Sequence, residues 1–399
     1  MKLKEALRAN ADEVHAYLEE LDARLKCPIY ASMDIRHNAD KAAIVDANAF
    51  PAGFHNLVPA ARRAASDVAR GYLHRNHPGA KLILVLAESH TRNLAYHEHL
   101  AALRGVLEAA GYEVLLGMRT QGEPVPAGLH AVERRGDALW ADGRRADLVI
   151  LNHDLSGGVP PELEDLAQPV NPPLAMGWHR RRKSEHFAIA NRFAHELGDR
   201  IGLDGWLLSA EFAAVDGVGF RERRNLEAVA DAVDAVVARV AEKQAEHGIR
   251  RAPAVFVKAD AGTYGRAITT ATSGRDFLAS LNARNRAEMD RGKGSQKTEA
   301  IIVQESVPTS LRRHGVVAEP VLYAMCSVPV GMFHRLHDTK GDDENLNAPG
   351  ARFEPVLLPG QEGDGYRLEA DAARVDLTLG RLHALATGQE TMAMRQNTA

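Results

Sequence analysis

A continuous apolar segment at residues 81–86 most strongly constrains the fold of this chain. It has the length of a buried strand, and a helical segment (residues 96–110) and a second apolar strand (residues 112–116) follow it directly. A strand, a helix and a strand in this order predict a βαβ unit, in which the two strands are parallel. Residues 147–151 repeat the apolar pattern, and we expect them to form another strand of the same sheet.

The segments before this unit have a different character. Residues 3–25 have the pattern of an amphipathic helix. Residues 30–56 are polar, rich in Asn and Asp, and interrupted by Pro51 and Gly53, so the sequence does not predict one regular element there. Long loops of this kind inside compact domains are often functional.

Prolines mark a predicted domain boundary. Four of them interrupt the pattern after the last predicted strand: Pro160, Pro161, Pro172 and Pro173. A chain of 399 residues is long enough for two or three domains with their own cores. We therefore divide it into an N-terminal α/β domain (residues 1–175) and a second domain (residues 176–399).

The second domain contains further helices and strands. Apolar residues recur at three- and four-residue steps in residues 221–247, which predicts a long helix that ends at Gly248. Residues 183–196 predict a shorter helix, and strands are expected at residues 254–258, 300–304 and 321–325. The expected fold class is α/β (α+β), with the parallel-sheet domain first.

Composition excludes several classes of partner. The formal net charge of −4 provides no large basic field for nucleic acid. Cys27 and Cys326 have no metal or redox spacing, which fits a reducing compartment. The first residues lack the apolar core of a signal peptide, and no window reaches the ~18 apolar residues of a membrane span. We expect a cytoplasmic protein with small-molecule partners and no membrane partner, and a homo-oligomer is compatible with the sequence.

The stretch that ends the strand at residues 254–258 has the properties of a phosphate site. Lys258 ends the strand, and a glycine-bearing turn follows: Gly262, Thr263, Tyr264 and Gly265. Glycines let backbone N–H groups approach phosphate oxygens, and a lysine at the strand end can neutralise their charge. The stretch is neither a Walker A loop nor a dinucleotide fingerprint. Taken alone, the stretch is more typical of an ordinary hairpin that carries a surface lysine.

Later segments add to the nucleotide interpretation. Gln304 and Glu305 end an apolar strand, where backbone groups could meet an adenine and a carboxylate could meet ribose hydroxyls. Oxygen donors of the kind that Mg²⁺ takes then follow: Glu319, Glu344, Asn345 and Asn347. The absence of paired Cys or His ligands favours Mg²⁺ over Zn²⁺. A zinc site at His90, His97 and His99 is not supported, because His97 and His99 are two apart on a predicted helix and point in different directions.

The order of these segments resembles the ATP-grasp ligases, and more closely the proteobacterial (ferrooxidans) type of glutamate–cysteine ligase. The resemblance covers about residues 30–355. Five stretches carry it: residues 32–36 with 50–57, 88–93, 177–183, 258–265 and 343–350.

The resemblance implies an ATP-grasp-like catalytic domain at residues 176–399, with residues 1–175 as substrate domain. It implies that ATP phosphorylates the γ-carboxylate of L-glutamate and that an amino acid then displaces phosphate to form an amide, with Mg²⁺ as cofactor. Cations on the reacting groups would come from Lys258, Arg335 and Arg36. The implied substrate-binding residues are Asp34, Arg36, Asn56, Arg92, Arg180 and Arg181. For any one of the arginines that would grip carboxylates, a structural salt bridge is an equal alternative.

Two departures from the family pattern leave the acceptor open. Arg266 and Ala267 change the phosphate loop, and residues 203–210 lack the family's proline-flanked form. A γ-glutamyl ligase for a small amino acid other than cysteine is therefore an alternative. A non-catalytic nucleotide-binding paralogue is a second one, although Lys258, Glu305 and Glu319 are all present.

Overall fold

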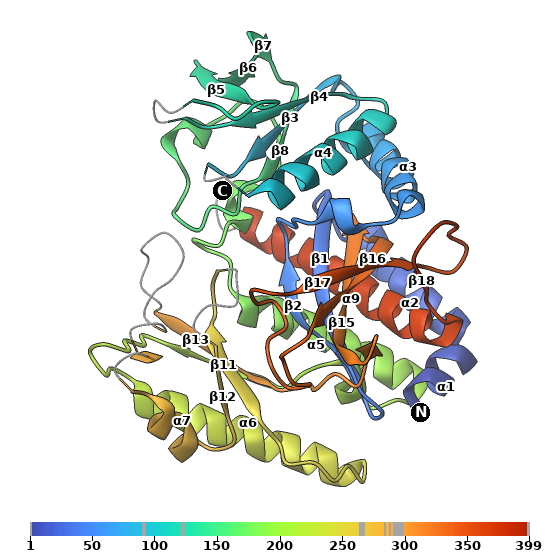
Figure 1. Cartoon of the computed structure of the whole chain (residues 1–399), viewed down its shortest axis with the longest axis vertical. Helices are drawn as coiled ribbons and strands as arrows, with labels where there is room; N and C mark the ends of the chain where they lie inside the picture. Colours follow the sequence, from blue (N-terminus) through green and yellow to red (C-terminus); the bar gives the residue numbers. More distant parts are fainter. Residues whose placement is uncertain are drawn as a thin grey trace.

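The computed structural model shows a mixed α/β fold in which three sheets follow one another along the longest axis of the molecule (Figure 1). It describes residues 2–89, 93–120, 124–262, 268–282, 285–286, 289 and 299–396. Within these residues, no helix is both long enough and apolar enough to cross a membrane.

The first sheet contains the predicted βαβ unit. β3 (Leu82–Ala87) pairs in parallel with β4 (Glu113–Met118) and with β8 (Leu148–Asn152), and α4 (Leu94–Ala109) connects β3 to β4. Every residue of β3 is buried, as its continuous apolar sequence predicts. The sheet has the order β7-β6-β5-β4-β3-β8-β9, with its other members at β5 (His130–Arg135), β6 (Ala138–Ala141), β7 (Arg144–Arg145) and β9 (Val170–Asn171).

The central sheet has the order β18-β17-β16-β15-β1-β2, and β14 (Arg312–Arg313) pairs with β15. Its strands are β1 (Tyr30–His37), β2 (Ala42–Asn48), β15 (Val316–Met325), β16 (Val328–His337), β17 (Arg352–Leu357) and β18 (Tyr366–Arg367). Residues 30–56, which the sequence did not predict as one regular element, form the β1–β2 hairpin and the 3₁₀ helix η1 (Phe54–Asn56). Strands from both sides of the predicted boundary at residue 175 share this sheet, and the division into two domains stays a prediction.

Helices cover one face of the central sheet. Its apolar side chains there pack in one core with α1 (Lys2–Ala9), α2 (Ala11–Arg24), α5 (Lys183–Ile201) and α9 (Ala370–Gln396). The single helix predicted at residues 3–25 is broken at Asn10. α9 runs along β1, β2, β15 and β16 (Figure 1), and its pattern did not predict a helix because many of its buried residues are polar.

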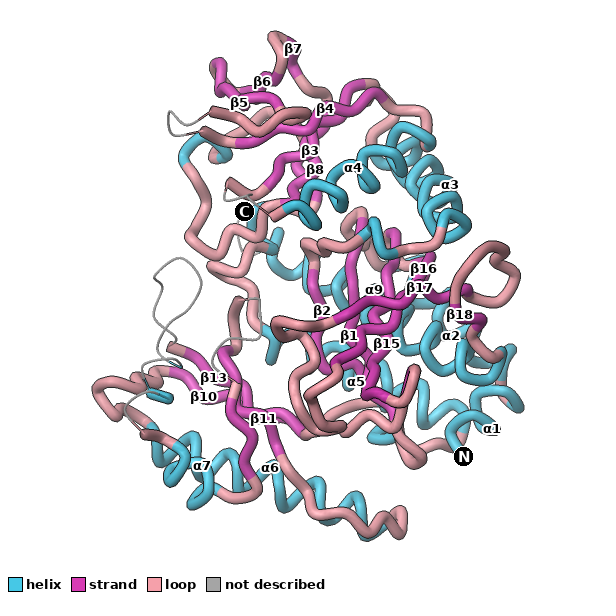
Figure 2. Tube along the Cα trace, viewed as in Figure 1, coloured by secondary structure: helices cyan, strands magenta, loops and turns pink. Residues whose placement is uncertain are grey.

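The third sheet has the order β10-β13-β11-β12 and carries the predicted phosphate lysine. Its strands are β10 (Phe212–Asp216), β11 (Val255–Ala259), β12 (Thr269–Ala271) and β13 (Ala300–Glu305). The predicted long helix is confirmed as α6 (Leu226–Glu246), which packs with α7 (Gly274–Ser280) on one face of this sheet (Figure 2). α3 (Pro59–Asn76) lies between the first and central sheets, and short 3₁₀ helices occur at η2 (Pro161–Leu163), η3 (Leu174–Met176) and η4 (Gly205–Leu208).

A buried ion pair ties the segment before α5 to α9. Arg181 Nε and Nη2 donate to the two carboxylate oxygens of Glu390 at 2.7 and 3.0 Å, and both side chains are almost fully buried. Arg181 Nη1 donates to the carbonyl oxygen of Ala47 on β2 at 2.8 Å. The pair therefore joins α9, the loop before α5 and the central sheet.

Removal of Glu390 should destabilise this junction strongly. Glu390→Ala leaves the Arg181 charge buried without its partner, which typically lowers the free energy of unfolding by about 3–5 kcal/mol. Glu108→Ala is the matched control, because Glu108 forms an exposed pair with Arg104 and should lower it by less than about 1 kcal/mol. Urea unfolding of both variants tests this, and equal effects would contradict a structural role for the buried pair.

Candidate active site

A cavity of about 340 Å³ lies between the central sheet and the ends of β3 and β8. One wall consists of polar side chains from β1, β2 and β16, and the other comes from the residues that follow β3 and β8. The charged and amide groups that line it are Asp34, Asp46, Asn48, Asn56, Glu88, Asn93, Asn152, Asp154, Arg335 and Asn347. Pockets of this size with few convergent polar groups are typical small-molecule sites.

A β-bulge in the β1–β2 hairpin shapes this wall. Asp34 lies directly opposite Asp46, whereas Ile35 lies opposite Ile44, so Val45 has no partner in the ladder. The extra residue lets both carboxylates line the cavity while Ile44 stays in the apolar core. It also leaves the carbonyl oxygen of Val45 to accept a hydrogen bond from Lys258 Nζ at 2.8 Å.

Arg335 connects carboxylates from two other strands. Its Nη1 lies 2.7 Å from Asp34 Oδ2 and 2.6 Å from Glu319 Oε1. Burial would lower the pKa of Arg335, but the two carboxylates outweigh it and raise the pKa. Burial raises the pKa of Asp34 although Arg335 opposes this effect. Arg335 therefore stays charged at the cavity wall, as a cation for anionic substrates requires.

Two lysines lie beside the carboxylate of Asp46. Lys183 Nζ forms an ion pair with Asp46, and Lys258 lies close enough to stabilise the same carboxylate. Burial would raise the pKa of Asp46, but the lysines outweigh it and lower the pKa to about 2. Burial lowers the pKa of Lys258 to about 8. Asp260, two residues after Lys258, accepts hydrogen bonds from Ser184 N and Oγ at the start of α5, which fixes the end of β11.

Arg36 is engaged by other groups of the protein. Its Nε forms an ion pair with Glu319, and its Nη1 and Nη2 donate to the carbonyl oxygens of Asp342 and Glu344 at 2.9 and 2.7 Å. The residue is 4% exposed. These contacts hold the acidic loop against the central sheet, and the catalytic and substrate-binding role of Arg36 stays a prediction.

Two other predicted contacts are also occupied by the protein. The Glu305 carboxylate accepts hydrogen bonds from Lys41 Nζ, Trp206 Nε1 and the Glu211 backbone N–H. Arg181 is held by Glu390 and is 1% exposed. The ribose contact of Glu305 and the carboxylate grip of Arg181 stay predictions. Sequence alone cannot distinguish a binding side chain from one whose partner is elsewhere in the fold.

The remaining predicted residues fall into three groups. Asp34, Asn56 and Arg335 line the cavity together. Arg180 is partly exposed, and its side chain makes no hydrogen bond or ion pair with the described residues. Gly262 has a left-handed φ of 97°, as a tight turn requires. The others lie outside the described residues: Arg92, Thr263, Tyr264 and Gly265, together with Arg266 and Ala267 of the altered loop.

The predicted metal ligands are not gathered at one point. Both oxygens of Glu319 are engaged by Arg36 and Arg335. Glu344 accepts from Lys340 and from the Gly341 N–H, which together lower its pKa. Asn345 Oδ1 accepts from the Asn347 N–H at 3.0 Å. Of the four, Asn347 lines the cavity.

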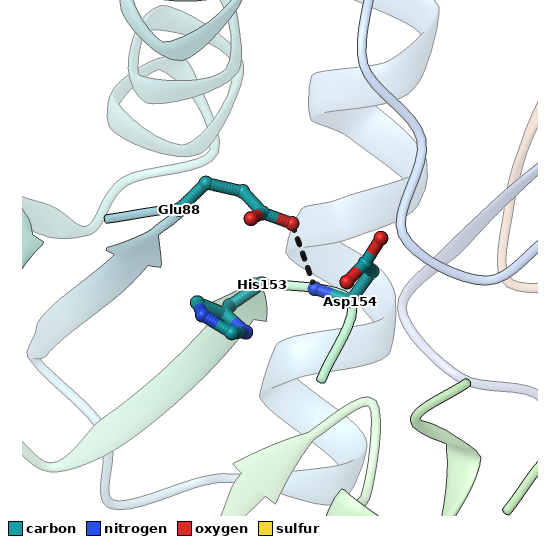
Figure 3. Close-up of side chains that lie close together, drawn as sticks. All are labelled: Glu88, His153 and Asp154. Carbon is teal, nitrogen blue, oxygen red and sulfur yellow. Dashed lines mark hydrogen bonds between the residues drawn. The ribbon is translucent and has the colours of Figure 1, made fainter. Parts of the chain in front are cut away.

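The sequence interpretation missed three residues at the end of the parallel sheet. Glu88 follows β3, and His153 and Asp154 follow β8 (Figure 3). Each of the three offers one side-chain atom that could bind a metal ion, and these atoms lie within 4.8 Å of one another. Glu88 Oε1 also accepts a hydrogen bond from the Asp154 backbone N–H at 3.1 Å. Ligands in α/β proteins bind outside the carboxyl ends of parallel strands, so the polar residues directly after two predicted parallel strands were the signal.

Comparisons with known proteins identify the family of the chain. A family model described as "Glutamate-cysteine ligase" matches residues 4–391. The chain is similar to the solved "Putative gamma-glutamylcysteine synthetase" from Methylobacillus flagellatus KT, with 34% identity and a TM-score of 0.88 over 100% of this chain and 96% of that chain. D-alanyl-alanine synthetase A from Vibrio cholerae O1 biovar eltor str. N16961 is 12% identical over 61% of this chain and 67% of that chain, and its TM-score of 0.27 supports no argument. No curated protein matches the chain significantly.

The buried position of Lys258 predicts an unusual titration. Competitive labelling with an amine-reactive reagent, read by mass spectrometry, should show half-maximal reactivity of Lys258 at a pH of about 8, against about 10.4 for an ordinary lysine. Asp46→Asn should move the midpoint lower, because Asp46 favours the charged amine. A midpoint near 10.4, or an upward shift in Asp46→Asn, would contradict the geometry of this cluster.

Proposed function

The chain belongs to the glutamate–cysteine ligase family, and from that premise we propose that it uses ATP to join the γ-carboxylate of L-glutamate to the amino group of L-cysteine. The observation that carries the proposal is the cavity lined by Arg335, Asp34 and Asp46, with Lys183 paired to Asp46 and Lys258 close to the same carboxylate. Such a set can bind a substrate that carries both signs of charge next to an anionic phosphate.

The nucleotide would lie between the central sheet and the third sheet, in an ATP-grasp-like arrangement. Lys258 lies opposite Ile302, and Gln304 is two residues further along β13, so both side chains project from the same face of the third sheet. The Gln304 amide is buried, yet neither its oxygen nor its nitrogen has a hydrogen-bond partner among the residues that the structure describes. A carboxamide with a vacant donor and acceptor matches the edge of adenine, and such a group is costly to leave unpaired.

Mg²⁺ fits the chemistry of the donors at this cavity. Asp34, Asp46 and Asn347 line it with oxygen atoms, which are the ligands that Mg²⁺ prefers. Asn347, with Asn345 beside it, would hold the ion at the phosphates, and Glu319 would join them on release from its arginines. The bound ion would supply positive charge to the phosphate oxygens.

The residues present suit amide formation in two steps. Lys258 and Arg335 would neutralise the phosphate oxygens while the glutamate γ-carboxylate oxygen attacks the terminal phosphorus of ATP, which releases ADP. The amine nitrogen then bonds to the carbonyl carbon, and the bond from that carbon to the phosphate oxygen breaks. Phosphate carries away one of the two protons that the ammonium group loses. Asp34, with its raised pKa at the cavity wall, would accept the other.

The alternative of a non-cysteine acceptor loses one of its supports. Within residues 203–210, η4 (Gly205–Leu208) is buried and Trp206 donates to Glu305, and no residue of this segment lines the cavity. The altered segment therefore has a structural role. The other support, at Arg266 and Ala267, lies outside the described residues, so the identity of the acceptor stays a prediction.

The direct test is phosphate release by the purified protein with ATP, Mg²⁺ and glutamate against a panel of amino acids. Cysteine should support the highest kcat/KM. Lys258→Ala should lower kcat by about a hundredfold or more, because it removes charge stabilisation from the reacting phosphates, while the free energy of unfolding changes by no more than about 1 kcal/mol. Lys340→Ala, which removes a surface lysine paired with Glu344, is the control. Near-normal activity of Lys258→Ala would remove this residue from the mechanism.

The oxygen-only ligand set predicts a strict requirement for Mg²⁺ or Mn²⁺. Excess chelator should abolish turnover, Zn²⁺ alone should not restore it, and Asn347→Ala should raise the Mg²⁺ concentration needed for half-maximal rate by about tenfold. Asn76→Ala is a control, because Asn76 lies at the end of α3 away from the cavity. Full activity in excess chelator would refute the metal assignment.

A further inference from the structure

Phe353 on β17 is an exposed aromatic residue in the wall of the cavity. Three large apolar side chains are exposed in the described part of the chain: Leu94 (79%), Val328 (40%) and Phe353 (46%). The Phe333 ring packs against Phe353 in an edge-to-face arrangement, with the ring centroids 5.3 Å apart and an angle of 81° between the ring planes. Both rings line the cavity.

Of these three exposed residues, Phe353 is the one that lines the cavity. Burial of an aromatic ring stabilises a protein by about 1.5–3 kcal/mol, so a ring left open at a polar cavity points to a ligand that covers it. Exposed apolar groups rimmed by polar residues commonly mark such binding sites.

L-Glutamate carries an α-ammonium group as well, but its side chain ends in a carboxylate that has to reach the cations Arg335 and Lys258. It therefore offers no apolar side-chain end to the Phe353 ring. An acceptor such as cysteine, in contrast, combines an ammonium group with a small side chain of low polarity. The cavity offers carboxylates at Glu88 and Asp154, on the wall formed by the ends of β3 and β8, so it provides a partner for each part of such a molecule.

We propose that Phe353 determines the acceptor specificity of the enzyme. The acceptor's side chain packs on the Phe353 ring, and its α-ammonium group faces the carboxylates of Glu88 and Asp154 before it loses its protons. This inference rests on the proposed function and deepens it. Phe353 lies directly opposite Arg335 in the β16–β17 pairing, so a side chain that packs on the ring lies beside the cation that would hold the reacting γ-carboxylate of glutamate.

The test compares cysteine with serine, which differ by one sulfur atom replaced by oxygen. Phe353→Ala should lower the ratio of kcat/KM for cysteine to that for serine by at least about tenfold, because the contact favours the less polar side chain. The KM values for glutamate and ATP should stay within about twofold of wild type. Phe353→Leu, which keeps an apolar side chain, should retain most of the discrimination and guards against a folding defect.

Val328→Ala is the matched control, because Val328 is an exposed apolar residue that does not line the cavity, and its ratio should equal that of wild type. Glu88→Gln should raise the KM for cysteine and leave the KM for glutamate unchanged. An unchanged cysteine-to-serine ratio in active Phe353→Ala would overturn the inference, as would an effect confined to the KM for glutamate. Absence of glutamate-dependent phosphate release in the wild-type protein would instead overturn the proposed function.

Discussion

The guanidinium group of Arg335 bridges two carboxylates, Asp34 and Glu319, that belong to two other strands of the central sheet. Buried charges are unfavourable unless each has a partner, so this bridge requires β1, β15 and β16 to meet in one register. Glu319 extends it to Arg36, which holds the loop that carries Asn345 and Asn347. The same interaction therefore organises the sheet, the acidic loop and one wall of the cavity.

The parts of the fold that follow simple apolar patterns could be predicted from the sequence. β3 is buried along its whole length, and α6 presents one apolar face, so both were recognised. β1 was missed although Met33 and Ile35 alternate with Asp34 and Arg36, because residues 30–56 were interpreted together as one polar stretch. α9 was missed because its buried side includes the polar residues Asp376, His383 and Glu390.

The site shows the same division. Asp34, Asn56 and Arg335 lie together at the cavity. Asp34 and Asn56 belong to a stretch that carries the family resemblance, and Arg335 was named as what the resemblance implies. Arg181 and Glu305 were also assigned to ligands, and in the fold they pair with Glu390 and Lys41, which are distant in the sequence. Only the fold brings these partners together, and the same is true of the residues that follow β3 and β8.

The central claim is that the residues of the cavity beside Arg335 serve to activate the γ-carboxylate of glutamate by phosphorylation. Glutamate labelled with ¹⁸O in its γ-carboxylate tests it most directly, with mass spectrometry of the inorganic phosphate formed during amide synthesis. The account predicts one ¹⁸O atom in each phosphate released, since the oxygen of the broken carbon–oxygen bond leaves with phosphorus. Formation of the γ-glutamyl amide with unlabelled phosphate would contradict it.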